Sequence, residues 1–292
     1  MIFGKVRLLA RRSSRRAPWA GAAVRFGAVS LACVLWAGCG LAPPPQRPSS
    51  LGFASHGALW HGVRLPAGHP SYALARPQGD AAWATPALVR VLTEAADFVR
   101  QRYPGTAPLK VGDLSARRGG VHPRHGSHRT GRDADVLFYL ADERGSSVLG
   151  SGFFRFDERG VSVSPTGAGG VRFFDTARNW ALVRALLASE VPVQWLFCSA
   201  GVKARLLEYA AVHETRPEVI TRASYVLHQP SYGNPHADHF HVRIGCTAEE
   251  RALGCLDVGP FWPWWRDQHE KPYWPGEDRN DDASLLAALL SD

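Results

Sequence analysis

The sequence predicts an α+β fold for its main domain. Segments typical of short strands and segments typical of amphipathic helices both occur, without the regular β-α-β order of a parallel sheet. The composition is that of a globular protein, with 45% hydrophobic and 21% charged residues in 292. These observations exclude collagen-like, coiled-coil and wholly disordered chains.

The expected elements follow from capping signals and apolar spacing. A helix is expected over 86–103, because Thr85 can cap it and Pro86 suits the first helical position. Asp175 can cap a second helix, and two more are expected near 201–213 and 217–228. Strands are expected at 110–115, 133–140, 193–198 and 238–244, with a loop rich in Gly, His and Arg between the first two.

The N-terminus has the pattern of a signal peptide. Seven of the 34 basic residues and none of the acidic ones lie within 1–39, where an apolar run ends at Cys39. This order is typical of secretion, and Trp-Ala-Gly-Cys resembles a bacterial lipobox, which makes Cys39 the expected lipidation site. The alternatives are ordinary cleavage without lipidation and an uncleaved membrane anchor, for which the apolar run from Phe26 to Ala42 is barely long enough. We expect export to the bacterial periplasm, or to the outer membrane as a lipoprotein.

The remaining chain divides by composition. Residues 40–75 are expected to be a linker and lead-in, with the Pro- and Ser-rich stretch 41–57 as a tether. Residues 76–275 form the expected catalytic domain, and 276–292 an acidic tail. The Trp-rich segment 261–274 is expected to be a buried flap over the sheet rather than a sugar-stacking surface. Beyond residue 39 the chain carries 27 basic against 26 acidic side chains, so nucleic-acid binding is not expected.

Six of the twelve histidines fall in two short windows, at 122–128 and 236–241. In a strand, His239 and His241 point to one face, and so do Asp133 and Asp135. Zinc accepts both imidazole and carboxylate ligands. One histidine and one carboxylate from the first window, with one histidine from the second, leave a fourth position for water, which is typical of a catalytic site. His122 is expected to be a bystander.

Four cysteines lie beyond the apolar run's Cys33. Cys246 and Cys255 are close in sequence and could pair in an oxidising compartment. Cys198 follows a predicted buried strand and is expected to be an inert core thiol. The absence of a C-x-x-C pair excludes a zinc ribbon and a thioredoxin-type site.

The motifs resemble a known family. Val111–Ser115, Gly119-Gly120, the run H-x-S-H-x-x-G-x-D-x-D that ends at Asp135, and H-x-D-H-F-H-V-R from 236 together resemble the penicillin-insensitive murein endopeptidases. These belong to the LAS group of zinc peptidases, with D-Ala-D-Ala carboxypeptidases and lysostaphin-like enzymes. The resemblance spans roughly 76–256. Arg129 departs from it, since the family usually has Gln there.

The resemblance implies a small antiparallel sheet that carries the site and is flanked by helices. It implies one zinc ion per chain and a disulfide between Cys246 and Cys255. The resemblance implies zinc ligands at His128, Asp135 and His241. It also implies catalytic roles for His239 and His236. His125 and Asp133 are expected to support the ligands.

The function implied is hydrolysis of amide bonds in murein cross-links of the D-Ala–diaminopimelate type. The expected partners are the cross-link peptides and, with Cys39 lipidated, a membrane. The alternatives are a D,D- or L,D-carboxypeptidase of the same group and a non-catalytic zinc-containing cell-wall binding module. His239 is the expected base; Asp238 is the rival, ranked lower because strand alternation would turn it to the opposite face.

Overall fold

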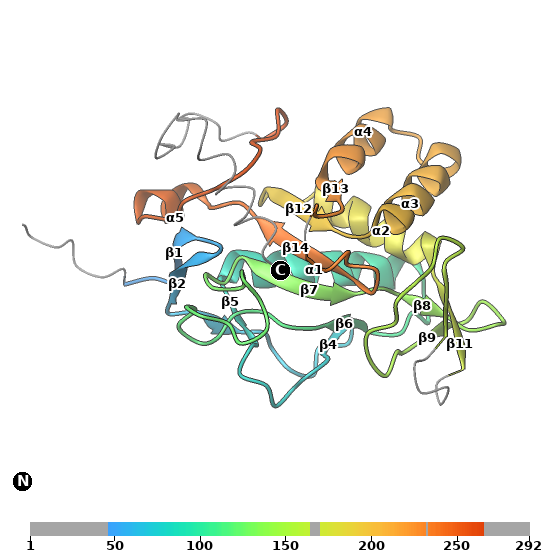
Figure 1. The fold of residues 1–292 in the computed structure, drawn as a ribbon, viewed down its shortest axis with the longest axis horizontal. Helices are drawn as coiled ribbons and strands as arrows, with labels where there is room; N and C mark the ends of the chain where they lie inside the picture. Colours follow the sequence, from blue (N-terminus) through green and yellow to red (C-terminus); the bar gives the residue numbers. More distant parts are fainter. Residues whose placement is uncertain (1–45, 164–169, 232, 266–292) are drawn as a thin grey trace, which may run out of the picture. The chain divides into compact units, whose positions relative to one another are not determined.

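The computed structural model describes residues 46–163, 170–231 and 233–265 (Figure 1). The chain divides into two units, 1–43 and 44–292, and every described residue belongs to the second. The expected signal peptide, Cys39 and the expected acidic tail lie outside the described residues. Within the described part, no helix is both long enough and apolar enough to cross a membrane.

A six-stranded sheet forms the centre of the domain. Its order is β13 (Leu227–His228), β12 (Val193–Phe197), β14 (His239–Ile244), β7 (Asp133–Leu137), β6 (Leu109–Val111) and β4 (Tyr72–Leu74). The four central strands pair antiparallel, whereas β13 and β4 join the edges in parallel. The α+β class is confirmed, and the antiparallel character holds for the centre of the sheet.

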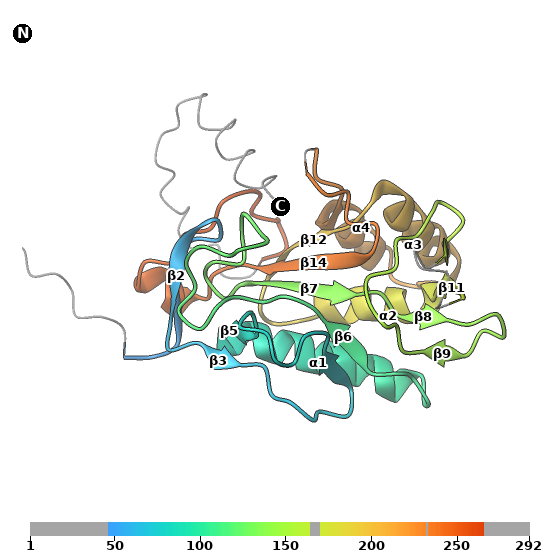
Figure 2. The same ribbon diagram turned by 60° about the horizontal axis from the view of Figure 1, so that its bottom comes forward.

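Within the described ranges, five helices accompany the sheet: α1 (Pro86–Arg102), α2 (Thr176–Leu187), α3 (Ala200–His213), α4 (Pro217–Val226) and α5 (Ala248–Ala252). Thr85 caps α1 by accepting a hydrogen bond from the backbone of Leu88 at 3.3 Å, and Asp175 caps α2 in the same way. The first two helices pack on each other at one side of the sheet (Figures 1 and 2). The four long helices therefore begin within a residue or two of the expected positions.

Alternation along β14 separates the core from the opposite face. Phe240, Val242 and Ile244 are fully buried in the hydrophobic core with the apolar residues of α1 and α2. Their neighbours His239, His241 and Arg243 therefore point to the other face of the sheet. The pairing with β7 places His241 opposite Asp135, so polar residues from both strands meet on that face.

Smaller sheets surround the centre. A four-stranded sheet has the order β10 (Val161–Val163), β11 (Val171–Phe174), β8 (Leu140–Ala141) and β9 (Ser147–Val148), and a two-stranded pair joins β3 (Val63–Arg64) to β5 (Trp83–Ala84). The expected strand over 133–140 is thus two strands in different sheets. The expected strand over 110–115 ends at Val111, so Asp113 lies in irregular backbone.

Residues 49–60 differ from the expected tether. They form a hairpin of β1 (Ser49–Phe53) and β2 (His56–Trp60). Ser50 is fully buried, and its hydroxyl accepts a hydrogen bond from Arg132 at 3.0 Å. Gly52 exchanges backbone hydrogen bonds with Gly254 and Leu256. The Pro- and Ser-rich composition wrongly predicts a tether here, because residues distant in sequence form hydrogen bonds with the hydroxyl of Ser50 and the backbone of Gly52.

The segment after β14 is fixed to the sheet. Cys246 and Cys255 form a disulfide, with Cα atoms 6.0 Å apart. The remaining cysteine of the described residues, Cys198, is a buried free thiol, and burial raises its pKa to about 12. Trp262 is buried, packs edge-on against Trp195 and donates a hydrogen bond to the Gln194 carbonyl at 2.7 Å. The disulfide is therefore confirmed, and residues 261–265 form the expected flap; residues 266–274 lie outside the described part.

Candidate metal centre

Asp135 is the residue on which the histidines converge. It projects from β7, is 2% exposed, and its Oδ1 lies 3.3 Å from Nε2 of both His128 and His239. Its Oδ2 lies 3.4 Å from Nε2 of His125. Burial raises the pKa of Asp135, but the imidazoles of His128 and His239 outweigh it and hold the pKa well below its ordinary value. A buried carboxylate thus faces three imidazole nitrogens.

His128 has the environment expected of a metal ligand. It is fully buried, and neither of its ring nitrogens makes a hydrogen bond with the described residues, although buried polar groups normally have a partner. The ligand atoms of His125, His128 and Asp135 lie within 4.8 Å of one another. Imidazole and carboxylate are ligands that zinc accepts, so these three residues form a candidate metal-binding group.

His241 is oriented by Asp133. Its Nε2 lies 2.8 Å from Asp133 Oδ1, and Arg243 Nε lies 2.6 Å from the same oxygen. Burial raises the pKa of Asp133, but Arg243 and His241 outweigh it and keep the group ionised. A carboxylate only accepts hydrogen bonds, so His241 donates from Nε2, and Nδ1 is the nitrogen suited to a metal. The His241 ring centroid lies 4.6 Å from that of His128.

His239 lies between two carboxylates. Its Nε2 faces Asp135, and its Nδ1 lies 2.6 Å from Asp238 Oδ1. Burial lowers the pKa of His239, but Asp135 and Asp238 outweigh it and raise the pKa to about 9. The expectation that Asp238 faces the opposite side is wrong, because β14 begins at His239 and strand alternation does not reach residue 238.

His236 stands beside both histidines of β14. It is 2% exposed, and its ring centroid lies 5.0 Å from that of His239 and 5.7 Å from that of His241. His236 and His128 have positive φ values of 52° and 59°, a region that non-glycine residues seldom adopt. Backbone strain of this kind persists where the surrounding structure holds a side chain in place.

The loop that carries His122, His125 and His128 is closed at its base by Gly119. This residue has φ +64°, and a Cβ there would lie 2.0 Å from the carbonyl oxygen of Arg129. The next residue, Gly120, donates a backbone hydrogen bond to the same carbonyl at 2.9 Å. Only glycine allows this approach, so the Gly-Gly pair holds together the two ends of the loop.

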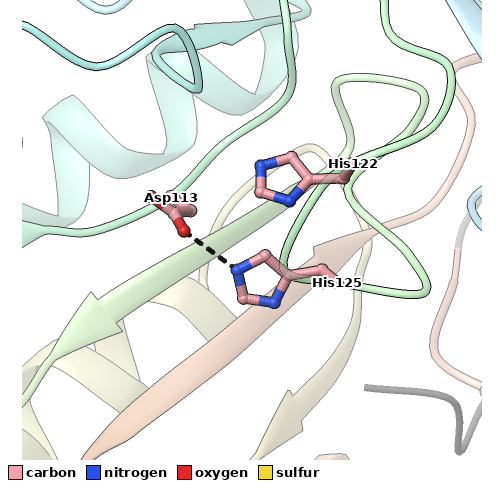
Figure 3. A group of neighbouring side chains, drawn as sticks. All are labelled: Asp113, His122 and His125. Carbon is pink, nitrogen blue, oxygen red and sulfur yellow. Dashed lines mark hydrogen bonds and ion pairs between the residues drawn. The ribbon is translucent and has the colours of Figure 1, made fainter.

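A second cluster joins the loop to Asp113 (Figure 3). His125 Nε2 lies 3.0 Å from Asp113 Oδ2, and the His122 ring centroid lies 4.7 Å from that of His125. His122 is 5% exposed, and burial, with the neighbouring His128 and His125, lowers its pKa to about 4. That His122 is a bystander stays a prediction. His125 therefore links Asp113 to Asp135.

The expected site residues thus meet on one face of the sheet, but sequence reasoning missed several of their neighbours. Asp113 lies in the motif Val111–Ser115, which contributed to the family resemblance but was given no role in the site. The signal that could have identified Asp113 is its position just after a strand that leads to the histidine loop. Phe153 packs edge-on against His239, with centroids 5.4 Å apart. No sequence signal points to Phe153, because it reaches the site from a separate loop.

Comparisons with known proteins point to one family. The sequence profile of the family described as penicillin-insensitive murein endopeptidase matches residues 50–259. This range contains every candidate ligand and all of the hairpin of β1 and β2 except Ser49. A protein of Haemophilus influenzae named penicillin-insensitive murein endopeptidase is 24% identical over 220 residues, which cover 73% of this chain and 68% of that protein.

Proposed function

The chain belongs to the penicillin-insensitive murein endopeptidase family, and we propose that it is a zinc peptidase that hydrolyses the amide bonds of murein peptide cross-links. The observation that carries this proposal is the convergence of His128, His125 and His239 on the buried Asp135. The H. influenzae relative, by its name, is a murein endopeptidase. The substrate bond that this class of activity favours is the D-Ala–diaminopimelate link.

The donor set fits zinc. His128, Asp135 and His241 would hold one ion per chain. Neither ring nitrogen of His128 makes a hydrogen bond with the described residues, and Asp133 accepts from Nε2 of His241, so that Nδ1 is the nitrogen suited to a metal. His125 lies close enough to Asp135 to be a rival for one position. The chemistry that a bound zinc ion supplies is Lewis acidity, which makes a water molecule more acidic and polarises the scissile carbonyl.

We assign the proton transfers of the reaction to side chains of the protein. Asp238 accepts from Nδ1 of His239 and leaves Nε2 directed toward the centre. The charge of Asp135 that raises the pKa of His239 would be neutralised by a bound metal ion, which would leave the imidazole able to accept a proton. In this state His239 takes a proton from the attacking water at Nε2 and passes it to the leaving amine, while Asp238 stabilises the imidazolium. His236, beside both rings, and Asp133, bonded to His241, keep the imidazoles in these orientations.

Digestion of purified murein sacculi tests the activity. We expect the purified protein to convert cross-linked muropeptide dimers into monomers without creating new glycan ends. A chelator should stop the reaction, and added zinc should restore it, because removal of the ion removes the Lewis acid. Chromatography of the released muropeptides, with metal analysis of the same sample, measures both effects.

Other product patterns decide between the alternatives. Release of single D-Ala residues with the cross-links intact would contradict an endopeptidase and identify a carboxypeptidase. Zinc binding at one ion per chain, without products from sacculi, would identify a binding module. Activity that persists in chelator after the metal has been shown to leave would refute the zinc mechanism.

We also propose that the chain is exported and processed near Cys39, which a murein substrate in the cell envelope requires. Mass spectrometry of the mature N-terminus should find a cysteine that carries a diacylglyceryl group, with or without a further N-acyl chain. A mature chain that begins after Cys39 would contradict lipidation and leave export intact. An unprocessed chain that starts at Met1 would contradict both.

A further inference from the structure

Two arginines outside the candidate metal centre converge on Asp113. Arg76 donates from Nη1 to Oδ1 at 2.8 Å, and Arg124 donates from Nε to Oδ2 at 2.7 Å and from Nη2 to Oδ1 at 3.0 Å. The Asp113 side chain is 3% exposed, but those of Arg76 and Arg124 are 46% and 47% exposed. A buried carboxylate therefore fixes two guanidinium groups that face solvent.

This arrangement does not suit a second cation. The Asp113 carboxylate accepts hydrogen bonds from two guanidinium groups, a pairing that favours its ionised form. Its single negative charge is already opposed by two permanent positive charges, because arginine stays protonated in proteins. A metal ion bound to Asp113, His122 and His125 would meet both guanidinium groups at close range. The excess positive charge favours an anion instead.

We propose that Arg76 and Arg124 form a subsite that binds a carboxylate of the murein peptide beside the scissile amide. This inference rests on the proposed function for its substrate. In a cross-link to diaminopimelate, the carbon that bears the acceptor nitrogen also bears a free carboxylate. A subsite for it must lie near the metal centre, and Asp113 is separated from Asp135 only by the imidazole of His125, at 3.0 and 3.4 Å.

Both arginines have donors left for a ligand. The hydrogen bonds to Asp113 engage Nη1 of Arg76, and Nε and Nη2 of Arg124. A guanidinium group has five N–H donors in a planar fork that matches a carboxylate. Arg76 also lies over the Phe153 ring, 5.5 Å from its centroid, and Phe153 packs against His239. The subsite and the proposed base therefore share one wall.

Prior fixation of the side chains strengthens this assignment. A flexible arginine loses rotamer freedom when it binds a ligand. Here the hydrogen bonds to Asp113 restrict both side chains during folding, and the Phe153 ring further restricts Arg76. Both groups are presented in a fixed geometry, which favours recognition of one carboxylate position over attraction of anions in general.

The test compares two cross-linked peptide dimers that differ only at this carboxylate, which is free in one and a carboxamide in the other. Calorimetry would measure the binding of each dimer to zinc-loaded full-length protein, in which His239→Ala slows hydrolysis. Arg76→Gln and Arg124→Gln are added singly and together. Arg90→Gln, an exposed arginine on α1, is the matched control for the loss of one charge.

We expect the parent protein to bind the acid at least tenfold more tightly than the amide. Each Gln variant should weaken binding of the acid about tenfold, leave binding of the amide unchanged and retain its zinc. Arg90→Gln should change neither Kd. If the parent binds both dimers equally, or if the variants lose zinc and both ligands together, the arginines only support the loop and the proposal is refuted.

The same two dimers separate this inference from the proposed function. The protein with His239 intact is incubated with both dimers, and products are measured. Discrimination in binding without any hydrolysis would refute the peptidase and leave the carboxylate subsite. Equal hydrolysis and equal binding of acid and amide would refute the subsite and leave the peptidase. Failure to bind either dimer would refute both.

Discussion

Replacing His241 by alanine is expected to abolish both zinc binding and murein hydrolysis. The variant loses a proposed ligand and leaves Asp133 and Arg243 in contact without the imidazole that Asp133 orients. Two remaining protein ligands should hold zinc poorly, so zinc content should fall well below one ion per chain. Metal analysis, thermal midpoint and muropeptide release on one preparation measure the effect.

His239→Ala is the informative partner variant. It leaves His128, Asp135 and His241 in place, so zinc should stay near one ion per chain, while the rate should fall by roughly 10²–10⁴, the usual contribution of a general acid–base group. His213→Ala, at an exposed position at the end of α3, should alter neither property. Loss of zinc from His239→Ala but not from His241→Ala would reverse the two roles. Full activity in both would place the chemistry elsewhere.

The largest expected effect on stability comes from Asp257→Ala. Asp257 accepts a hydrogen bond from Arg132 Nη1 at 2.7 Å, and its partner is 1% exposed. It also accepts from the backbone N–H of Cys246 at 2.9 Å. Removal of one member of a buried ion pair leaves the other charge uncompensated and typically costs 3–5 kcal/mol. We expect the free energy of unfolding to fall by about that amount.

Urea denaturation of both proteins measures this difference. Glu249→Ala is the control, since Glu249 is an exposed carboxylate on α5 in the same region, and it should change stability by less than about 0.5 kcal/mol. A cost below about 1 kcal/mol for Asp257→Ala would show that water or a rearranged neighbour compensates Arg132. The hydrogen bond from Arg132 to Ser50 would then contribute little to holding the hairpin of β1 and β2 in place.

Local signals predicted the helices and the face of the site. Two adjacent residues, Thr85 and Pro86, determine the cap and the first turn of α1 without contacts to distant parts of the sequence. Likewise, alternation alone places His239 and His241 together on one face. The pairing of β14 with β7 then brings that face to Asp133 and Asp135. Short-range rules therefore sufficed for the residues that a regular strand carries.

The errors arose where distant residues decide the structure. Ser50 lies in a Pro- and Ser-rich stretch, yet it is buried because Arg132 and Glu250, 82 and 200 residues away in sequence, bond to it. The orientation expected for Asp238 was wrong because β14 begins one residue later, at His239. The environment of Asp113 depends on Arg76 and Arg124, which belong to separate loops. No window of neighbouring residues contains this information.

The alternation along β14 also limits how this protein can change. One run of six residues supplies both the apolar packing of the core and the imidazoles of the proposed centre. A single inserted or deleted residue would exchange the two faces and bury the histidines where Phe240 and Val242 now pack. Lineages of this protein should therefore accept length variation in loops away from the proposed ligands but not within β14. Libraries intended to alter its specificity are better built on the loops that carry Arg76 and Phe153.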